Sequence, residues 1–127
     1  MRILVVEDEP NLQRQLRETL EAAGYAVDGA TDGEDGHFLG TTESYDAVVL
    51  DLGLPEMDGL TVLDRWRKSG LTMPVLVLVS AHHSEVDRAR GAFAGCDHYL
   101  AKPADDKALR ALLSQYRPRP APRVARR

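Results

Sequence analysis

Short apolar runs recur five times along the 127-residue chain, and stretches with helical spacing separate them. Two of these runs, residues 47–50 and 75–79, contain no polar residue. A strand with one face in water alternates apolar and polar side chains, so fully apolar runs are typical of strands buried on both faces of a parallel sheet. The pattern therefore predicts the α/β class, with helices on both faces of the sheet.

The spacing of apolar residues also places the individual elements. We expect strands at residues 2–6, 25–30, 47–50, 75–79 and around 99–100. Helices are expected from Pro10 to a stop at Gly24, from Gly33 onward, and over about 60–66, 84–94 and 109–113. Gly36 and Gly40 weaken the second of these helices, because glycine disfavours helix formation.

Chain length and cysteine usage limit the class of protein. A chain of 127 residues fits one domain with one core. The lone Cys96 excludes an internal disulfide, which favours the reducing cytoplasm. Residues 1–8 have too short an apolar run for a secretion signal, and no stretch is long enough to span a membrane. We therefore expect a soluble cytoplasmic protein without a membrane segment.

Charge is distributed unevenly between the body of the chain and its last residues. Residues 117–127 carry five Arg, three Pro and no acid, so taking those five from the 16 Lys and Arg leaves 11 basic against 20 acidic residues. An acidic body argues against nucleic-acid binding by the folded part. We predict a domain over residues 1–116 and a flexible Pro/Arg-rich tail over 117–127. The tail is either simply solvated or touches nucleic acid or anionic lipid.

Polar residues follow the predicted strands at the points where the strands end. Glu7 and Asp8 follow the first, Asp51 the third, Ser80 the fourth and Lys102 the fifth. In open parallel sheets ligands bind beyond the carboxyl ends of the strands, so all five fall on the edge where chemistry is expected. Each also has a structural alternative: a solvated helix start for the acids, a helix cap for Ser80 and a surface charge for Lys102.

Together these side chains predict a site for a metal ion and a phosphoryl group. Clustered carboxylates repel one another, so a bound cation would stabilise them. Because all of the ligands offer oxygen, Mg²⁺ or Mn²⁺ is the favoured ion. The ammonium of Lys102 and the hydroxyl of Ser80 could hold phosphoryl oxygens beside the metal. Asp51 would then be the nucleophile, since phosphoryl transfer depends mainly on positioning and charge neutralisation.

Four sequence motifs carry a resemblance to a known family. They are Ile-Leu-Val-Val-Glu-Asp-Glu at residues 3–9, Val-Leu-Asp-Leu-Gly-Leu-Pro-Glu-Met-Asp-Gly at 49–59, Ser-Ala at 80–81 and Asp-His-Tyr-Leu-Ala-Lys-Pro at 97–103. Over about residues 1–116 the chain resembles the receiver domain of bacterial two-component response regulators. The resemblance implies a flavodoxin-like sheet with strand order 2-1-3-4-5.

The resemblance also implies a role for each site residue. Asp51 is the phosphoacceptor, Ser80 and Lys102 bind the phosphoryl group, and Ser80 and Tyr99 move as the switch. Asp8, Asp51 and the backbone carbonyl of Gly53 hold Mg²⁺, and Glu7 assists through water. The implied partners are a histidine kinase or phosphotransfer protein and a downstream protein target, with the chain a monomer or a phosphorylation-dependent dimer.

The function that we predict is a phosphorylation-controlled signalling switch rather than an enzyme acting on a separate substrate. A nucleotide-dependent enzyme is disfavoured because the first strand is followed by Glu-Asp-Glu-Pro-Asn at residues 7–11 instead of a glycine-rich phosphate loop. Two alternatives stay open: the receiver half of a DNA-binding transcription factor, and a passive phosphate carrier. His82 and His83, just past Ser80, either tune access to the site or are incidental.

Overall fold

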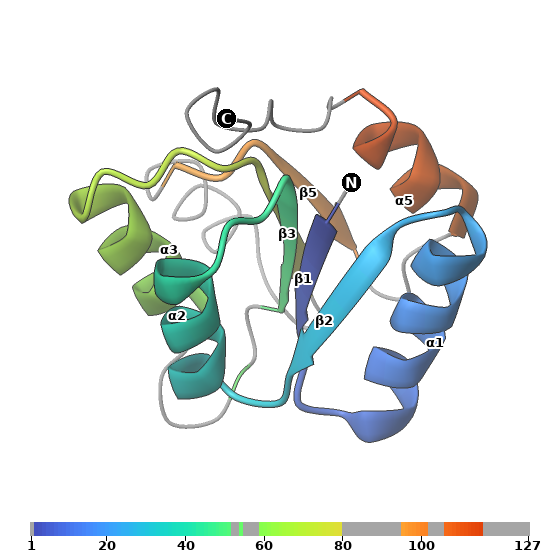
Figure 1. The fold of residues 1–127 in the computed structure, drawn as a ribbon, viewed down its shortest axis with the longest axis horizontal. Helices are drawn as coiled ribbons and strands as arrows, with labels where there is room; N and C mark the ends of the chain where they lie inside the picture. Colours follow the sequence, from blue (N-terminus) through green and yellow to red (C-terminus); the bar gives the residue numbers. More distant parts are fainter. Residues whose placement is uncertain (1, 52–53, 55–58, 80–94, 102–105, 116–127) are drawn as a thin grey trace, which may run out of the picture.

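The computed structural model describes residues 2–51, 54, 59–79, 95–101 and 106–115. Within them, five parallel strands form one sheet in the order β2-β1-β3-β4-β5 (Figure 1). The strands are β1 (Arg2–Val6), β2 (Ala26–Ala30), β3 (Ala47–Asp51), β4 (Val75–Val79) and β5 (His98–Ala101). The predicted α/β class and the strand order implied by the resemblance are both confirmed.

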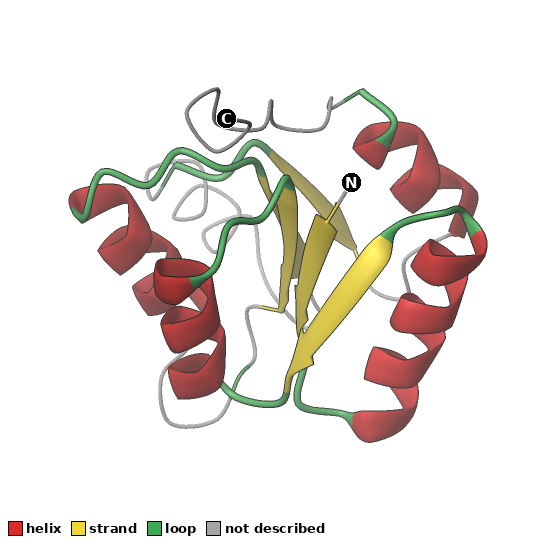
Figure 2. Cartoon of the chain, viewed as in Figure 1, coloured by secondary structure: helices red, strands yellow, loops and turns green. Residues whose placement is uncertain are grey.

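Helices cover both faces of the sheet. Figure 2 shows α1 (Pro10–Ala22) and α5 (Asp106–Leu113) on one face, and α2 (Gly33–Thr42) and α3 (Gly59–Lys68) on the other. The helix predicted over 84–94 and the tail predicted over 117–127 lie outside the described residues. No helix in the described part of the chain is long and apolar enough to cross a membrane.

Two apolar cores, one on each face, explain why the central strands carry almost no polar residues. Along β1, Ile3 and Val5 enter the core beneath α1 and α5, whereas Leu4 and Val6 enter the core beneath α2 and α3. All four side chains are fully buried. Successive strand residues point to opposite faces, so a strand covered on both sides must be apolar at every position.

Helix α2 is ten residues long in spite of its two internal glycines. A Cβ atom on Gly36 would lie 2.7 Å from Cγ1 of Val6, and one on Gly40 would lie 2.4 Å from Cζ2 of Trp66. The two glycines therefore do not shorten α2, and their lack of a side chain lets the helix approach β1 and α3 closely. Trp66 is fully buried at this contact, and its indole Nε1 donates to the carbonyl of His37 at 3.3 Å.

Gly40→Ala should lower the free energy of unfolding by about 1–3 kcal/mol, the usual cost of forcing extra atoms into a packed core. In an exposed helix the same substitution would instead stabilise by about 1 kcal/mol. Urea unfolding of the parent and the variant measures the difference. Thr41→Ala, at an exposed neighbouring position, is the control and should change stability little. A more stable Gly40→Ala variant would contradict the packing described here.

A polar cluster ties the first strands together near their amino ends. Nη2 of Arg2 and the hydroxyl of Tyr45 both donate to Oδ2 of Asp28, at 2.6 and 2.8 Å. Burial raises the pKa of Asp28, but hydrogen bonds from Tyr45 and Arg2 outweigh it, so the pKa lies below the usual range. Burial and the bond to Asp28 raise the pKa of Tyr45. The cluster lies away from the strands' carboxyl ends and leaves that edge to other side chains.

Candidate functional site

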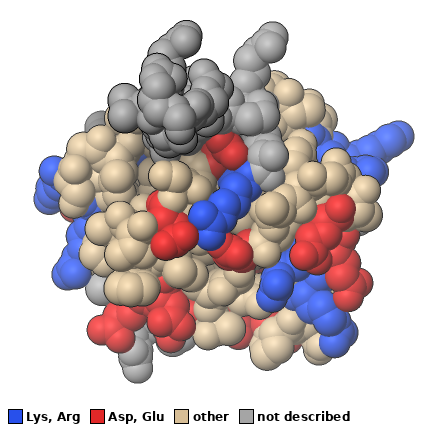
Figure 3. Space-filling view, in the orientation of Figure 1, with Lys and Arg blue, Asp and Glu red and all other residues tan. Residues whose placement is uncertain are grey.

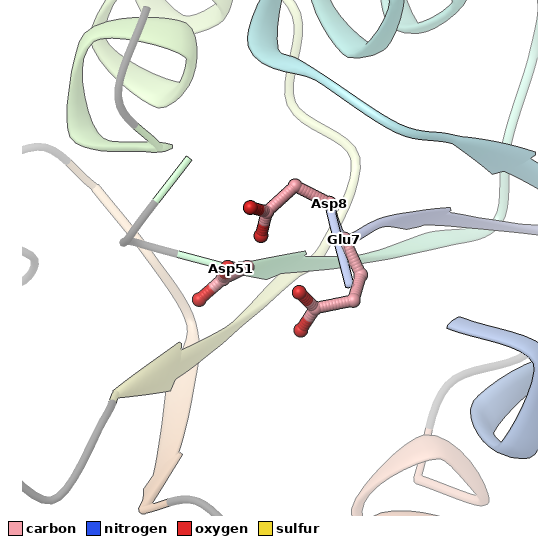
Figure 4. Close-up of side chains that lie close together, drawn as sticks. All are labelled: Glu7, Asp8 and Asp51. Atoms are coloured by element: carbon pink, nitrogen blue, oxygen red, sulfur yellow. The ribbon is translucent and has the colours of Figure 1, made fainter. Parts of the chain in front are cut away.

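Three carboxylates converge at the carboxyl edge of the sheet. Val6 pairs with Leu50 in the register of β1 and β3, so the residues that follow them emerge side by side. Glu7 and Asp8 follow β1, and Asp51 is the last residue of β3. In Figure 4 the three side chains turn to the same side of these strand ends. One oxygen from each lies within 4.8 Å of the others.

The three acidic residues differ in their exposure. Glu7 is fully buried and Asp51 is 2% exposed, whereas Asp8 is exposed. Two carboxylates are thus held inside the fold, and the third stands at its surface, where a ligand can arrive from solvent. Unit charges about 4 Å apart repel by roughly 4 kcal/mol per pair at an effective dielectric of 20, so a cation at this edge would be strongly favoured.

Glu9, the third acid of the run at residues 7–9, has a separate role. Its carboxylate oxygens accept from the backbone N–H groups of Asn11 and Leu12, at 3.1 and 2.7 Å, and so cap the start of α1. The backbone N–H of Glu9 donates to Oε2 of Glu7 at 3.1 Å. The structural alternative of a helix start therefore applies to Glu9, while Glu7 and Asp8 turn toward Asp51.

Gln13 is a residue at this edge that the sequence analysis missed. Its side-chain Nε2 donates to the carbonyl of Glu7 at 3.2 Å and to the carbonyl of Ala30 at 2.9 Å. No sequence signal marks it, since a glutamine one turn into an amphipathic helix is ordinarily a surface residue. Its contacts depend on how α1 packs across the ends of β1 and β2.

The other predicted site residues are not part of the described geometry. Gly53, Ser80 and Lys102 lie outside the described residues, as do His82 and His83. Tyr99 belongs to β5 by its backbone, and its side chain lies outside what the structure describes. Their assignments stay predictions.

The donor set at this edge fits a hard divalent cation. All three groups offer carboxylate oxygen, and no His or Cys joins them within the described residues. Oxygen ligands of this kind suit Mg²⁺ and Mn²⁺, and a site with few protein ligands leaves positions for water and phosphate oxygens. A cation held by these carboxylates would neutralise the negative charge that accumulates when a phosphoryl group approaches a carboxylate.

Two further features bear on chemistry elsewhere in the described chain. Burial, and then the neighbouring Asp97, raises the pKa of the Cys96 thiol, which disfavours the reactive thiolate. Acidic and basic side chains are intermingled on the face shown in Figure 3. The described part thus presents no activated thiol, and the expectation that the folded part does not bind nucleic acid stays a prediction.

Comparisons with known proteins agree with one another. A family model described as "Response regulator receiver domain" matches residues 3–114. The transcriptional regulatory protein QseB of Haemophilus influenzae is 46% identical over 103 residues, which cover 81% of this chain and 46% of that protein. The chain spans about half the length of the curated relatives that it matches.

Solved structures give the same match at the level of the fold. The receiver domain of the Francisella response regulator 1452 superposes with a TM-score of 0.84 at 31% identity, covering 90% of this chain and 93% of that one. The receiver domain of the sensor histidine kinase PA1611 from Pseudomonas aeruginosa gives 0.82 at 32% identity, covering 91% and 95%. The latter structure holds a magnesium ion coordinated in its active-site cleft.

Proposed function

The chain belongs to the response regulator receiver domain family, and from this premise we propose that it is a signalling switch controlled by phosphorylation of Asp51 in the presence of Mg²⁺. The observation that carries the proposal is the convergence of Glu7, Asp8 and Asp51 at one edge of the sheet. The magnesium ion in the related PA1611 receiver domain supports the choice of metal.

We assign the metal to Asp8, Asp51 and the backbone carbonyl of Gly53, with Glu7 acting through water. Bound there, Mg²⁺ would supply charge neutralisation for the incoming phosphoryl group. Ser80 and Lys102 are proposed to hold the phosphoryl oxygens. Asp8 is the exposed member of the cluster, so its carboxylate would be the ligand most accessible to an ion from solvent.

The proposed reaction transfers a phosphoryl group from a phosphohistidine of a histidine kinase or phosphotransfer protein. A carboxylate oxygen of Asp51 forms the new bond to phosphorus, while the bond from phosphorus to the histidine nitrogen breaks and the imidazole leaves. Slow attack by water on the acyl phosphate returns Asp51 and inorganic phosphate. The chain thus catalyses only its own phosphorylation and dephosphorylation.

The proposed output is a conformational change that a downstream protein recognises. A hydrogen bond from Ser80 to the charged phosphoryl group exists only in the modified state and contributes about 1.5–3 kcal/mol. Converting a 1:99 equilibrium to 99:1 needs about 5.5 kcal/mol, so Lys102 or the bound partner must contribute as well. Tyr99 is proposed to move with Ser80.

We further propose that residues 1–116 form the receiver and residues 117–127 the tail. The protein is proposed to act in the cytoplasm as a monomer or a phosphorylation-dependent dimer.

A second candidate is the receiver half of a DNA-binding transcription factor. It is favoured by relatives that are named transcriptional regulatory proteins and of which this chain spans about half. In that case the output would be a change in DNA binding by another part of the protein. The phosphoacceptor chemistry is the same in both candidates.

Amide chemical shifts on adding beryllofluoride and Mg²⁺ test the switch. Beryllofluoride mimics a phosphoryl group on a carboxylate, so the parent should show shifts around Asp8 and Asp51 and also in β5 and residues 84–94. Asp51→Asn should show no shifts beyond those that Mg²⁺ causes on its own. Shifts confined to the neighbourhood of Asp8 and Asp51 would indicate a passive phosphate carrier instead of a switch. If adding beryllofluoride to Asp51→Asn in Mg²⁺ still shifted β5, Asp51 would be rejected as the acceptor.

A further inference from the structure

The side chain of Gln13 joins three elements at the carboxyl edge of the sheet. Gln13 lies in the first turns of α1, and its Nε2 donates to the carbonyl of Glu7, just after β1, at 3.2 Å. The same nitrogen donates to the carbonyl of Ala30, the last residue of β2, at 2.9 Å. One amide group therefore spans α1, β1 and β2 beside the carboxylates.

The chemistry of the two acceptors fixes the orientation of this amide. Both are backbone carbonyl oxygens, which only accept, so the nitrogen and not the oxygen of the side chain must face them. The carbonyl of Ala30 also accepts from the backbone N–H of Glu7 at 3.0 Å. Gln13 thus shares an acceptor with a backbone bond that joins Glu7 to the end of β2.

A glycine in β2 leaves room for the amide. A Cβ atom on Gly29 would lie 2.9 Å from Oε1 and 3.0 Å from Cδ of Gln13. Any side chain at position 29 would therefore push the amide away from its two carbonyls. The close fit between Gly29 and Gln13 gives this amide a defined place beside the end of β2.

We propose that Gln13 is a positioning residue for the carboxylate site, holding the turn that carries Glu7 and Asp8 so that their oxygens meet those of Asp51. This inference rests on the proposed function, since the site is taken to bind Mg²⁺. A carboxylate cluster binds an ion tightly only if its ligands are held in place against their mutual repulsion. Gln13 does so through the backbone of Glu7.

Gln13→Met tests the proposal, because methionine keeps the length of the side chain and removes its donors. The dissociation constant for Mg²⁺, measured by calorimetry on the folded protein, should rise about tenfold, the low end of what outer-shell partners contribute. Gln15→Met, at an exposed position of the same helix, is the matched control and should bind Mg²⁺ like the parent. If Gln13 only stabilises the fold, Gln13→Met should lower the free energy of unfolding in EDTA and leave the affinity of the folded protein for Mg²⁺ unchanged. That result would overturn the proposal.

Gly29→Ala supplies a second test that leaves Gln13 in the chain. The new methyl group should displace the amide and weaken Mg²⁺ binding as Gln13→Met does, and it should have little further effect in the double variant. If the losses of Mg²⁺ affinity from Gly29→Ala and Gln13→Met instead added up in the double variant, the proposed link between Gly29 and Gln13 would be wrong. If the parent binds Mg²⁺ and Gln13→Met binds it equally well, this inference alone fails; if the parent does not bind Mg²⁺, the proposed function fails and the inference falls with it.

Discussion

Asp8→Asn should raise the dissociation constant for Mg²⁺ by about 100-fold or more, beyond what is typical for loss of an outer-shell partner. The substitution removes one of three carboxylates whose oxygens lie within 4.8 Å of one another, and Asp8 is the one exposed to solvent. An amide oxygen can still reach the ion but carries no net charge. Titration calorimetry of the parent and the variant measures the change.

The same substitution should have the opposite effect on the protein without metal. Asp8 lies beside two buried carboxylates, so removing its charge relieves repulsion that Mg²⁺ no longer reduces once EDTA has removed the ion. Urea unfolding in EDTA should therefore show a more stable variant. Glu21→Gln, an exposed substitution at the far end of α1, controls for the change in net charge and should leave the dissociation constant for Mg²⁺ unchanged. Equal Mg²⁺ affinity in Asp8→Asn and the parent would reject Asp8 as a ligand.

The sequence was sufficient to predict the sheet and the side chains that follow its strands, for a physical reason. A strand buried on both faces is apolar throughout, as in residues 75–79, and it ends at the first polar residue. The same change that ends β3 therefore marks Asp51 as a residue at the edge. The order of the strands came from the resemblance, because apolar runs do not say which strand lies beside which.

Features that depend on contacts between distant residues were not visible in the sequence. Gly40 disfavours helix by its own propensity, yet Trp66, from another helix, occupies the space that a side chain would take. Gln13 was missed because its two acceptors are backbone carbonyls, which every residue has. The sequence also did not show which of the three acids at residues 7–9 caps the next helix. Only the path of the chain shows that Glu9 caps α1.

Asp51 should be the one residue that accepts a phosphoryl group from a small-molecule donor. It ends the central strand β3 and is 2% exposed, with the carboxylates of Glu7 and Asp8 beside it. Phosphoryl transfer to a carboxylate needs an adjacent cation more than a general base, so the reaction should require Mg²⁺. Asp51→Asn leaves the shape of the site nearly unchanged and removes the nucleophile, and it should abolish the reaction.

The intact mass of the chain after incubation with acetyl phosphate tests this account most directly. With Mg²⁺ the parent should gain the mass of one phosphoryl group, whereas the parent in EDTA and Asp51→Asn with Mg²⁺ should stay at their starting masses. A parent chain that gains no mass with Mg²⁺, or an Asp51→Asn variant that gains as much as the parent, would contradict the assignment of Asp51 as the phosphoacceptor.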